Sequence, residues 1–234
     1  MYKYILFDLD NTLLDFNAIE KDAITTLAKT FNIDLTLSEI DTYNKINVEC
    51  WGMLERKEAD KKYILSERFV RFFKLFGLDV DGSKCDEIFR SNLIKKQYPI
   101  DGAFDILDYC KNKGLKLYIC SNGVTITQIT RLNNMNMMPY FDGIYLSDQI
   151  GYAKPDKRFF EYVINDIKLN NETMTIDELI MIGDNLHSDM KGAKDSNITS
   201  CFYNYNKFDT QSDKEKFNNC DYIISHLSEL KQIL

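Results

Sequence analysis

Histidine, proline and tryptophan are scarce in this sequence, and patterns that mark several protein classes are missing. There are 2 histidines among 234 residues, and none of the 6 cysteines belongs to a Cys-x-x-Cys pair, which argues against a structural zinc site. No apolar run approaches the ~18 residues of a membrane span, and no basic-then-apolar leader precedes the first predicted strand. We therefore expect a cytoplasmic protein with reduced cysteines and no membrane partner.

A basic surface is also missing. The formal net charge is −7, and no cluster of Lys and Arg alternates with aromatic residues, so we expect no nucleic-acid partner. Hydrophobic residues make up 44% of the chain, enough for one large domain or for a core with a smaller appendage. This composition argues against disorder, and we expect a monomer or a small homo-oligomer.

The first apolar run ends in two carboxylates. Residues 5–7 (ILF) are typical of a strand buried on both faces. Asp8 and Asp10 follow, and because side chains two apart on a strand point the same way, they converge unless the turn re-aims Asp10. Two carboxylates ~4 Å apart repel by ~4 kcal/mol at an effective dielectric of about 20. A cation, a shared proton or basic partners would offset that repulsion; the alternative is an ordinary polar turn.

A helical segment follows, over residues 16–99. Apolar residues there recur at helical spacing, and no strand pattern is convincing. Ser38 is the predicted N-cap of one of its helices and Ser83 the predicted start of another. Gly77 is the predicted end of a third helix, and Pro99 the end of the helical block. We therefore predict an all-helical insert.

Helix and strand patterns alternate from residue 101 onward. Beyond the first strand, the predicted strands lie near residues 115–120, 144–146, 179–182, 198–203 and 222–224. This alternation predicts an α/β fold with a Rossmann-like parallel sheet and helices on both faces. The predicted core is discontinuous, made of residues 1–15 and 100–234, and the polar segment 204–219 is a predicted surface loop.

Further polar residues stand where the predicted strands end. Ser121 and Asn122 follow one strand, Lys154 stands at the start of a helix, and Asp184 and Asp189 share the loop after another strand. Each has an ordinary alternative, because Ser and Asp commonly cap turns and helices and most lysines are solvated. Together, however, their oxygen, hydroxyl, amide and ammonium groups suit a metal and a phosphate.

Such a site predicts phosphoryl transfer. The carboxylates of Asp8, Asp10 and Asp184 offer the oxygen ligands that Mg²⁺ prefers. Donors for the oxygens of a substrate phosphate come from Ser121, Asn122 and Lys154. A carboxylate, a metal and a lysine around one phosphoryl group specify this chemistry, with a small phosphate ester as the substrate.

The order of the motifs resembles that of the haloacid dehalogenase superfamily. The motifs are DLDNT at 8–12, SNG at 121–123, Lys-Pro at 154–155 and the loop at 183–189. The resemblance implies that Asp8 is a nucleophile that forms an aspartyl-phosphate and that Asp10 is the general acid and base. It implies that Ser121 and Lys154 bind the phosphoryl group.

The same resemblance implies a metal site and excludes two chemistries. The family's Mg²⁺ would be held by Asp8, by the backbone carbonyl of Asp10 and by Asp184, with Asp189 supporting them. P-type ATPases of the family carry Thr where this chain has Asp10, and its dehalogenases lack an Asp there. The chain therefore resembles the phosphatases and phosphomutases.

The helical insert resembles the cap of the subfamily that contains phosphoglycolate phosphatase, β-phosphoglucomutase and small nucleotidases. Within it, the chain most resembles the YjjG-like pyrimidine 5′-nucleotidases, through residues 8–16, 121–132, 140–142 and 182–189. Trp51, Arg68 and Phe69 of the insert are candidates to contact a nucleobase, since aromatic stacking and cation–π contacts suit a base. The alternative is that they form the core of the cap.

Three other functions compete with a Mg²⁺-dependent nucleoside 5′-monophosphate phosphatase. One is a phosphatase for a small metabolite such as a sugar phosphate or phosphoglycolate. Another is a receiver-like phosphoacceptor, which would carry its Asp on a later strand and have no helical insert. The third is a silent binding protein, against which the intact Asp8, Asp10, Lys154 and Asp184 argue.

Overall fold

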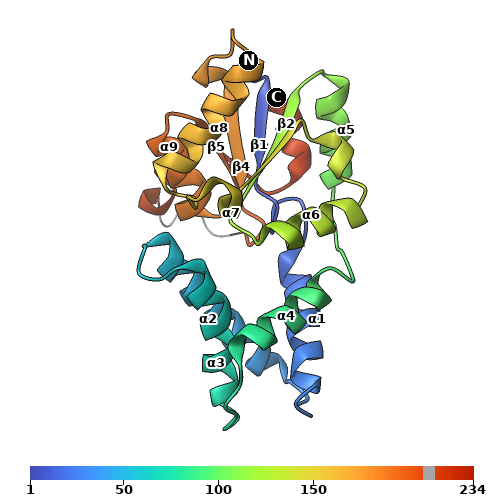
Figure 1. Cartoon of the computed structure of the whole chain (residues 1–234). Coiled ribbons are helices and arrows are strands. Elements are labelled where there is room, and N and C mark those ends of the chain that lie inside the picture. Colours follow the sequence, from blue (N-terminus) through green and yellow to red (C-terminus); the bar gives the residue numbers. More distant parts are fainter. Residues whose placement is uncertain (208–213) are drawn as a thin grey trace. The chain divides into compact units, whose positions relative to one another are not determined.

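The part of the chain that the structure describes is built round a six-stranded sheet. In this computed structural model, which describes residues 1–207 and 214–234, the strands run in the order β3-β2-β1-β4-β5-β6 and all neighbours are parallel (Figure 1). The strands are Tyr4–Phe7 (β1), Lys116–Ser121 (β2), Gly143–Leu146 (β3), Leu179–Gly183 (β4), Thr199–Tyr203 (β5) and Tyr222–Ile224 (β6). The predicted Rossmann-like sheet is confirmed, whereas the middle of the loop predicted at 204–219 lies outside the described residues.

The two faces of the sheet bury separate hydrophobic clusters. Every residue of β1 is buried, with Ile5 and Phe7 in one cluster and Tyr4 and Leu6 in the other. Because alternate side chains of a strand point to opposite faces, a central strand covered on both sides needs an apolar residue at every position. Residues of Ala103–Asn112 (α5) and Thr125–Asn134 (α6) belong to the first cluster and residues of Lys157–Asn170 (α8) and Gly192–Asp195 (α9) to the second, so helices cover both faces (Figure 1).

Short and long helices connect the strands. The α-helices between the strands from residue 103 onward are α5, α6, Ser147–Ile150 (α7), α8 and α9. The 3₁₀ turns are Met138–Tyr140 (η1), Ile176–Glu178 (η2), Lys214–Phe217 (η4) and Leu227–Gln232 (η5), and Leu186–Lys191 (η3) is π-helical.

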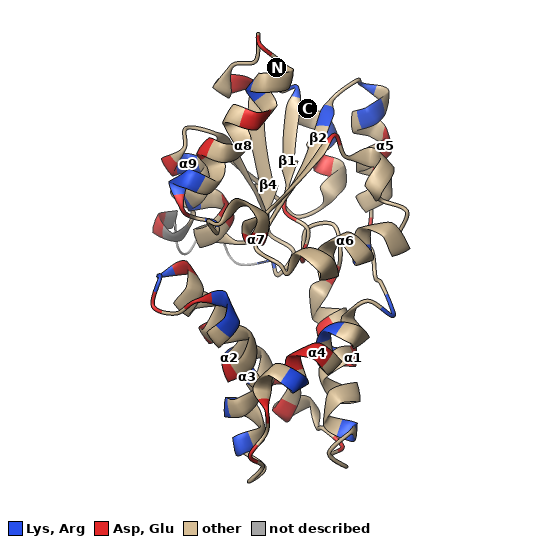
Figure 2. Ribbon diagram, viewed as in Figure 1, with Lys and Arg blue, Asp and Glu red and all other residues tan. Residues whose placement is uncertain are grey.

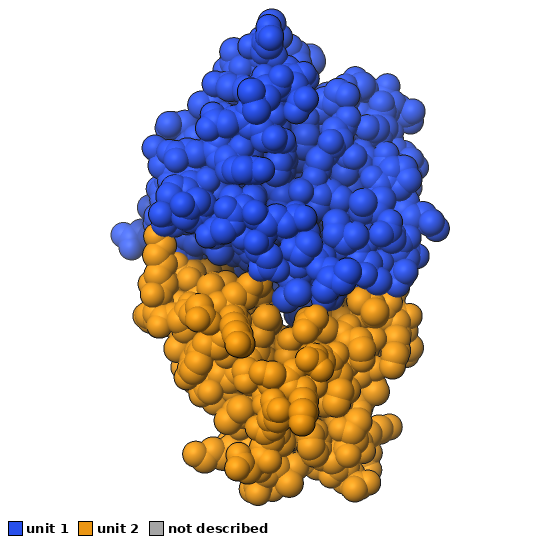
Figure 3. Space-filling model, in the orientation of Figure 1, with its two compact units in different colours: residues 1–16, 98–234 blue, residues 17–97 orange. Residues whose placement is uncertain are grey.

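The chain divides into two compact units (Figure 3). One consists of Met1–Phe16 with Tyr98–Leu234 and contains the sheet, and the other is Asn17–Gln97. Where the chain leaves and re-enters the first unit, two segments lie side by side. The Asp15 N–H donates to the Tyr98 carbonyl at 2.7 Å, and the Ile100 N–H donates to the Leu13 carbonyl at 2.9 Å.

The second unit is helical throughout its ordered elements. Its helices are Phe16–Lys29 (α1), Leu37–Glu55 (α2), Lys61–Lys74 (α3) and Gly82–Leu93 (α4). The first residue of α1, Phe16, still belongs to the first unit. Rings from three of these helices pack together, with Tyr43 stacked on Phe69 at 5.8 Å and Phe69 against Phe89 at 5.2 Å between centroids. All three rings are fully buried.

The predicted cap of α2 is wrong by two residues, and α4 starts one residue before its predicted start. Thr36, not Ser38, is the N-cap of α2, because its side chain accepts from the Glu39 N–H while the Glu39 carboxylate accepts from the Thr36 N–H at 2.7 Å. The N-cap of α4 is Asp81, whose carboxylate accepts hydrogen bonds from the backbone N–H groups of Ser83 and Lys84. In both cases a residue just before the predicted one reaches the free N–H groups of the first turn.

Charged residues of both signs are spread along the helices (Figure 2). Within the described residues, no helix combines the length and the apolarity that crossing a bilayer requires.

A network of hydrogen-bonded, buried polar side chains connects the helices of the second unit. Arg68 donates to Asp86 Oδ1 at 2.7 Å and to Asn47 Oδ1 at 2.9 Å, and Asn47 donates to Glu20 Oε1 at 2.6 Å. Arg90 binds the second oxygen of Asp86 at 2.6 Å. Apart from Arg90, these residues are 3–5% exposed, so their charges depend on one another rather than on water.

We expect Arg68→Ala to destabilise the helical unit by about 3–5 kcal/mol, because Asp86 stays buried and loses its main partner. Urea unfolding followed by the fluorescence of Trp51, the only tryptophan, measures this unit. The control is Arg56→Ala, which removes an exposed ion pair with Glu58 and should leave the midpoint unchanged. Equal midpoints for the two variants would contradict the stabilising role of the network.

Candidate active site

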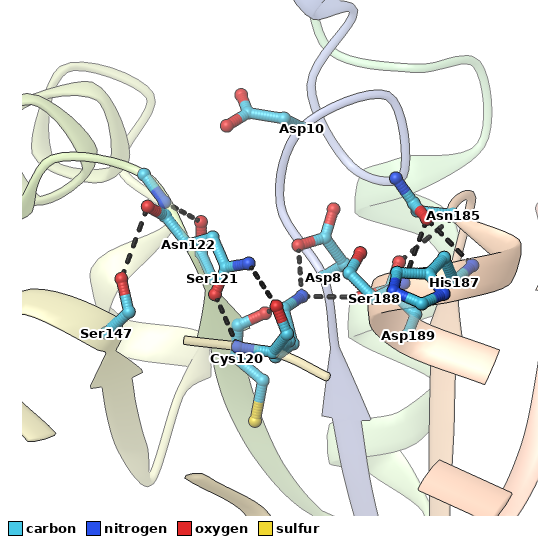
Figure 4. Close-up of polar contacts among 12 residues, drawn as sticks. Asp8, Asp10, Cys120, Ser121, Asn122, Ser147, Asn185, His187, Ser188 and Asp189 are labelled. Carbon is cyan, nitrogen blue, oxygen red and sulfur yellow. Dashed lines mark hydrogen bonds and ion pairs between the residues drawn. The ribbon is translucent and has the colours of Figure 1, made fainter. Parts of the chain in front are cut away.

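Three polar residues stand at the carboxyl ends of neighbouring strands. Asp8 follows β1 and Ser121 is the last residue of β2 (Figure 4), and Asp184 follows β4. Because β1 pairs with both β2 and β4, and the Asp8 N–H donates to the Ile182 carbonyl at 2.8 Å, these distant parts of the sequence meet at one edge. Ligand crevices open at this edge of parallel sheets.

Lys154 lies at the centre of this group. Its Nζ donates to Asp8 Oδ1 at 2.8 Å, to Asp189 Oδ1 at 2.5 Å and to the Cys120 carbonyl at 2.6 Å. These three acceptors use all the hydrogens of an ammonium, and the residue is only 2% exposed. Burial alone lowers the pKa of Lys154, but the charges of Asp189 and Asp8 raise it above its ordinary value, so the ammonium stays charged.

The carboxylates around Lys154 form an acidic cluster. One oxygen each from Asp8, Asp184 and Asp189 lies within 4.8 Å of the others. Burial raises the pKa of Asp8 to about 7, with repulsion from Asp189 and Asp10 adding to the rise and Lys154 opposing it. Burial, together with the charges of Asp8 and Asp189, also raises the pKa of Asp184 well above its usual range.

The cluster fits the predicted metal. Three carboxylates against one ammonium leave an excess of two negative charges when all four groups are ionised. A divalent cation would balance this excess, and carboxylate oxygens are the donors that Mg²⁺ prefers.

A glycine at the end of β4 lets Asp189 reach the cluster. A Cβ on Gly183 would lie 2.3 Å from Asp189 Oδ2, so a side chain there would collide with the carboxylate. Asp189 Oδ2 accepts from the Asn185 N–H at 3.1 Å, and the Asn185 side chain accepts from two backbone N–H groups at the start of η3. The loop therefore turns the carboxylate of Asp189 back towards Lys154.

Asn122 and Ser121 take different positions in the site. Asn122 Nδ2 donates to the Lys154 carbonyl and its Oδ1 accepts from the Lys154 N–H, both at 2.8 Å, so this side chain clamps the backbone of the lysine. Because both polar atoms of the Asn122 side chain are bound in this way, a hydrogen bond from residue 122 to a phosphate would come from its backbone N–H. Ser121 Oγ accepts from Gln128 and from the Gly123 N–H, both at 3.0 Å, which leaves its hydroxyl hydrogen to donate elsewhere.

Asp10 points away from Asp8 (Figure 4). The strand ends at Phe7, and Asn11 with a φ of 57° turns the chain, so the alternation that would bring Asp8 and Asp10 together is broken. The carboxylate of Asp10 is bound instead by Arg131 at 2.5 Å and by Gln128 at 2.7 Å.

Gln128 and Arg131 were not predicted from the sequence to belong to the site. Both lie on the buried face of α6 with Leu132, and Arg131 is fully buried. A signal was available, because a Gln and an Arg three residues apart follow the SNG motif and share a helix face with Leu132.

The structure favours the core alternative for two residues of the helical unit. Phe69 is fully buried between Tyr43 and Phe89, and Arg68 is 3% exposed and bound to Asp86, so neither presents a free face to a nucleobase. Both residues lie on the face of α3 that also buries Ile64, Phe72 and Phe73. Trp51 is half-buried, with Lys61 Nζ 5.9 Å from its ring centroid.

Gly183→Ala should lower the stability of the sheet unit by ~1–3 kcal/mol, because a methyl group would overlap Asp189 in a packed interior. Scanning calorimetry measures the change. Gly52→Ala is the matched control, since the atom nearest its added methyl group is the mobile end of Arg56, and its helix should tolerate alanine. A Gly183→Ala protein that melts like the control would contradict the close approach of Asp189.

Comparison with known proteins gives the same family that the motif order resembles. A model of the haloacid dehalogenase-like hydrolases matches residues 5–203. Pyrimidine 5′-nucleotidase PynA of Streptococcus pneumoniae is 35% identical over 203 residues, which cover 87% of this chain and 84% of that protein. Pyrimidine 5′-nucleotidase YjjG of Escherichia coli is 25% identical over 236 residues, 100% of this chain and 98% of that protein.

Two further comparisons bear on the metal and on the substrate. The structure resembles the crystal structure of the Bacillus subtilis hydrolase YfnB bound to magnesium, with a TM-score of 0.89 and 31% sequence identity. The match covers 100% of this chain and 98% of the YfnB chain. A glyceraldehyde 3-phosphate phosphatase of Methanocaldococcus jannaschii is 28% identical over 241 residues, 100% of this chain and 97% of that protein. Since the family model spans most of the sequence and PynA exceeds 30% identity over most of it, the chain belongs to the haloacid dehalogenase-like hydrolases.

Proposed function

We propose that this hydrolase is a magnesium-dependent phosphomonoesterase that works through an aspartyl-phosphate on Asp8, with a small phosphate ester as its substrate. The observation that carries the proposal is the contact of Asp8 with Lys154 inside the acidic cluster, at the carboxyl edge of the sheet. A carboxylate nucleophile needs positive charge beside it when it meets a phosphate dianion, and Lys154 supplies that charge.

The proposed metal ligands are Asp8, the backbone carbonyl of Asp10 and Asp184, with Asp189 supporting them. Support comes from the excess negative charge of the cluster and from the magnesium in the YfnB structure. When bound, Mg²⁺ would supply positive charge for the phosphate oxygens. Asp189 meanwhile holds Lys154 by one oxygen and the loop backbone by the other, and so orients the lysine.

In the proposed first half-reaction, an oxygen of Asp8 bonds to phosphorus while the bond from phosphorus to the ester oxygen breaks. Asp10, in its protonated form, gives its proton to that leaving oxygen. In the second half-reaction the Asp10 carboxylate takes a proton from water, and the water oxygen bonds to phosphorus. The bond from Asp8 to phosphorus breaks, which releases inorganic phosphate. Ser121 donates to the phosphoryl oxygens in both steps, and the positive charge of Lys154 balances their negative charge.

We propose further that the helical unit is the cap of this enzyme and helps to choose the leaving group. The proposed substrate is a nucleoside 5′-monophosphate, and pyrimidine nucleotides are favoured by the names of PynA and YjjG. Trp51, half-buried and near a lysine, remains the proposed base contact, since Arg68 and Phe69 are core residues. A phosphatase of a small metabolite is the second candidate, supported by the glyceraldehyde 3-phosphate phosphatase relative.

A panel of phosphate esters tests the substrate class. We expect phosphate release in Mg²⁺ to be fastest with UMP and CMP, slower with purine nucleotides and slowest with glyceraldehyde 3-phosphate and phosphoglycolate. EDTA should abolish all of it, because the excess charge of the acidic cluster would then be unbalanced. Faster release from the sugar phosphates would replace the nucleotidase proposal with the second candidate, and full activity in EDTA would reject the metal.

Replacing Asp8 tests the nucleophile. Asp8→Asn should abolish turnover and prevent the transfer of radiolabelled phosphate to the protein, because an amide oxygen is a far weaker nucleophile than a carboxylate. Burial already disfavours the charged form of Asp8, so the melting temperature in EDTA should not fall. Asp34→Asn, at an exposed position, is the matched control and should keep full activity. Turnover by Asp8→Asn would refute the assignment.

A further inference from the structure

Both carboxylate oxygens of Asp10 are held by side chains of α6. Arg131 donates to Oδ1 at 2.5 Å and Gln128 Nε2 donates to Oδ2 at 2.7 Å. Arg131 also donates to Gln128 Oε1 at 2.9 Å, so the three side chains close a ring of hydrogen bonds. A carboxylate fixed at both oxygens cannot rotate without breaking a contact.

The ring is built in the interior of the sheet unit. Arg131 is 0% and Gln128 1% exposed, and the Arg131 guanidinium lies 5.6 Å from the centre of the Phe16 ring. A buried guanidinium is costly unless it is paired, and its contact with Asp10 offsets part of that cost. Because this buried arginine binds Asp10, which the proposed function makes the acid and base, we consider what the contact does for the reaction.

Gln128 joins Asp10 to the predicted phosphate site. The same Nε2 that binds Asp10 also donates to Ser121 Oγ at 3.0 Å. Residue 123 leaves room for this arrangement, because a Cβ on Gly123 would lie 2.3 Å from Gln128 Nε2 and 2.5 Å from its Cδ. The glycine, the glutamine and the serine therefore act as one local structure.

We propose that Gln128 and Arg131 are positioning residues that aim the carboxylate of Asp10 and fix its distance from Ser121. The inference rests on the proposed function, in which Asp10 exchanges protons with the leaving oxygen and then with water. Proton transfer requires hydrogen-bond distance to the reacting oxygen, and a displacement of about 1 Å can lower a rate by ~10²-fold. The ring supplies the required precision from a rigid helix.

The test compares two esters that differ in their need for an acid. The nucleoside alkoxide of UMP leaves only when protonated, whereas the nitrophenolate of p-nitrophenyl phosphate leaves unaided. The variants Gln128→Leu and Arg131→Met should lower kcat for UMP by ~10²-fold with little change in KM. In rapid-mixing experiments they should keep most of the first-turnover release of p-nitrophenol. Asp10→Asn should show the same pattern with a loss of ~10²–10⁴-fold.

Two more variants guard against a simple loss of folding. Gly123→Ala removes no polar group but pushes Gln128 aside, so it should reproduce the Gln128→Leu pattern. Arg131→Lys keeps the charge and should recover part of the UMP rate that Arg131→Met loses. Asn133→Ala, at an exposed position of the same helix, is the control and should behave as the unaltered protein. Melting temperatures of all variants are measured alongside.

The outcomes separate the inference from the function on which it rests. If Asp10→Asn hydrolyses UMP at the normal rate, the acid and base role of Asp10 is refuted and the proposed function falls with it. If Asp10→Asn shows the selective loss but the variants at 128, 131 and 123 slow both esters equally, those residues are only structural and the inference alone is overturned. A selective loss in all of them supports the inference.

Discussion

The contact of one buried lysine with two buried carboxylates is the interaction on which this site depends. Lys154 neutralises part of the charge that Asp8 and Asp189 bring to the end of the sheet. Without it, three carboxylates within a few ångströms would repel one another in a medium of low dielectric. The surrounding structure serves this contact, because Asn122 clamps the lysine backbone and Gly183 makes room for Asp189.

A second pair of opposite charges stands apart from the first. Arg131 offsets part of the negative charge of Asp10, and the remaining repulsion from Asp10 adds to the rise in the pKa of Asp8. The two pairs divide the proposed chemistry, with bond formation to phosphorus at Asp8 and proton transfer at Asp10. Ser121 and Gln128 connect the two regions through one hydrogen bond.

The strand ends and their polar residues were predictable because they depend on local sequence and on a general property of parallel sheets. The direction of Asp10 was not, because it depends on the turn at Asn11 and on α6, which lies more than a hundred residues away in sequence. Burial of Arg68 was equally hidden, since its partner Asp86 lies on another helix. The cap of α2 could have been found, because Thr36 and Glu39 form the pattern of a capping box.

The insert leaves and rejoins the sheet unit at two segments that are hydrogen-bonded to each other, Asp15 to Tyr98 and Leu13 to Ile100. For the sheet unit, the insert is equivalent to a long loop whose two ends are held together by these hydrogen bonds. The entropic cost of closing a loop grows only slowly with its length. Insertions, deletions or the wholesale exchange of this segment would therefore leave β1 and the residues that follow it in register. With the proposed role of the insert as a cap, such an attachment would let evolution change the substrate while the proposed chemistry is inherited intact.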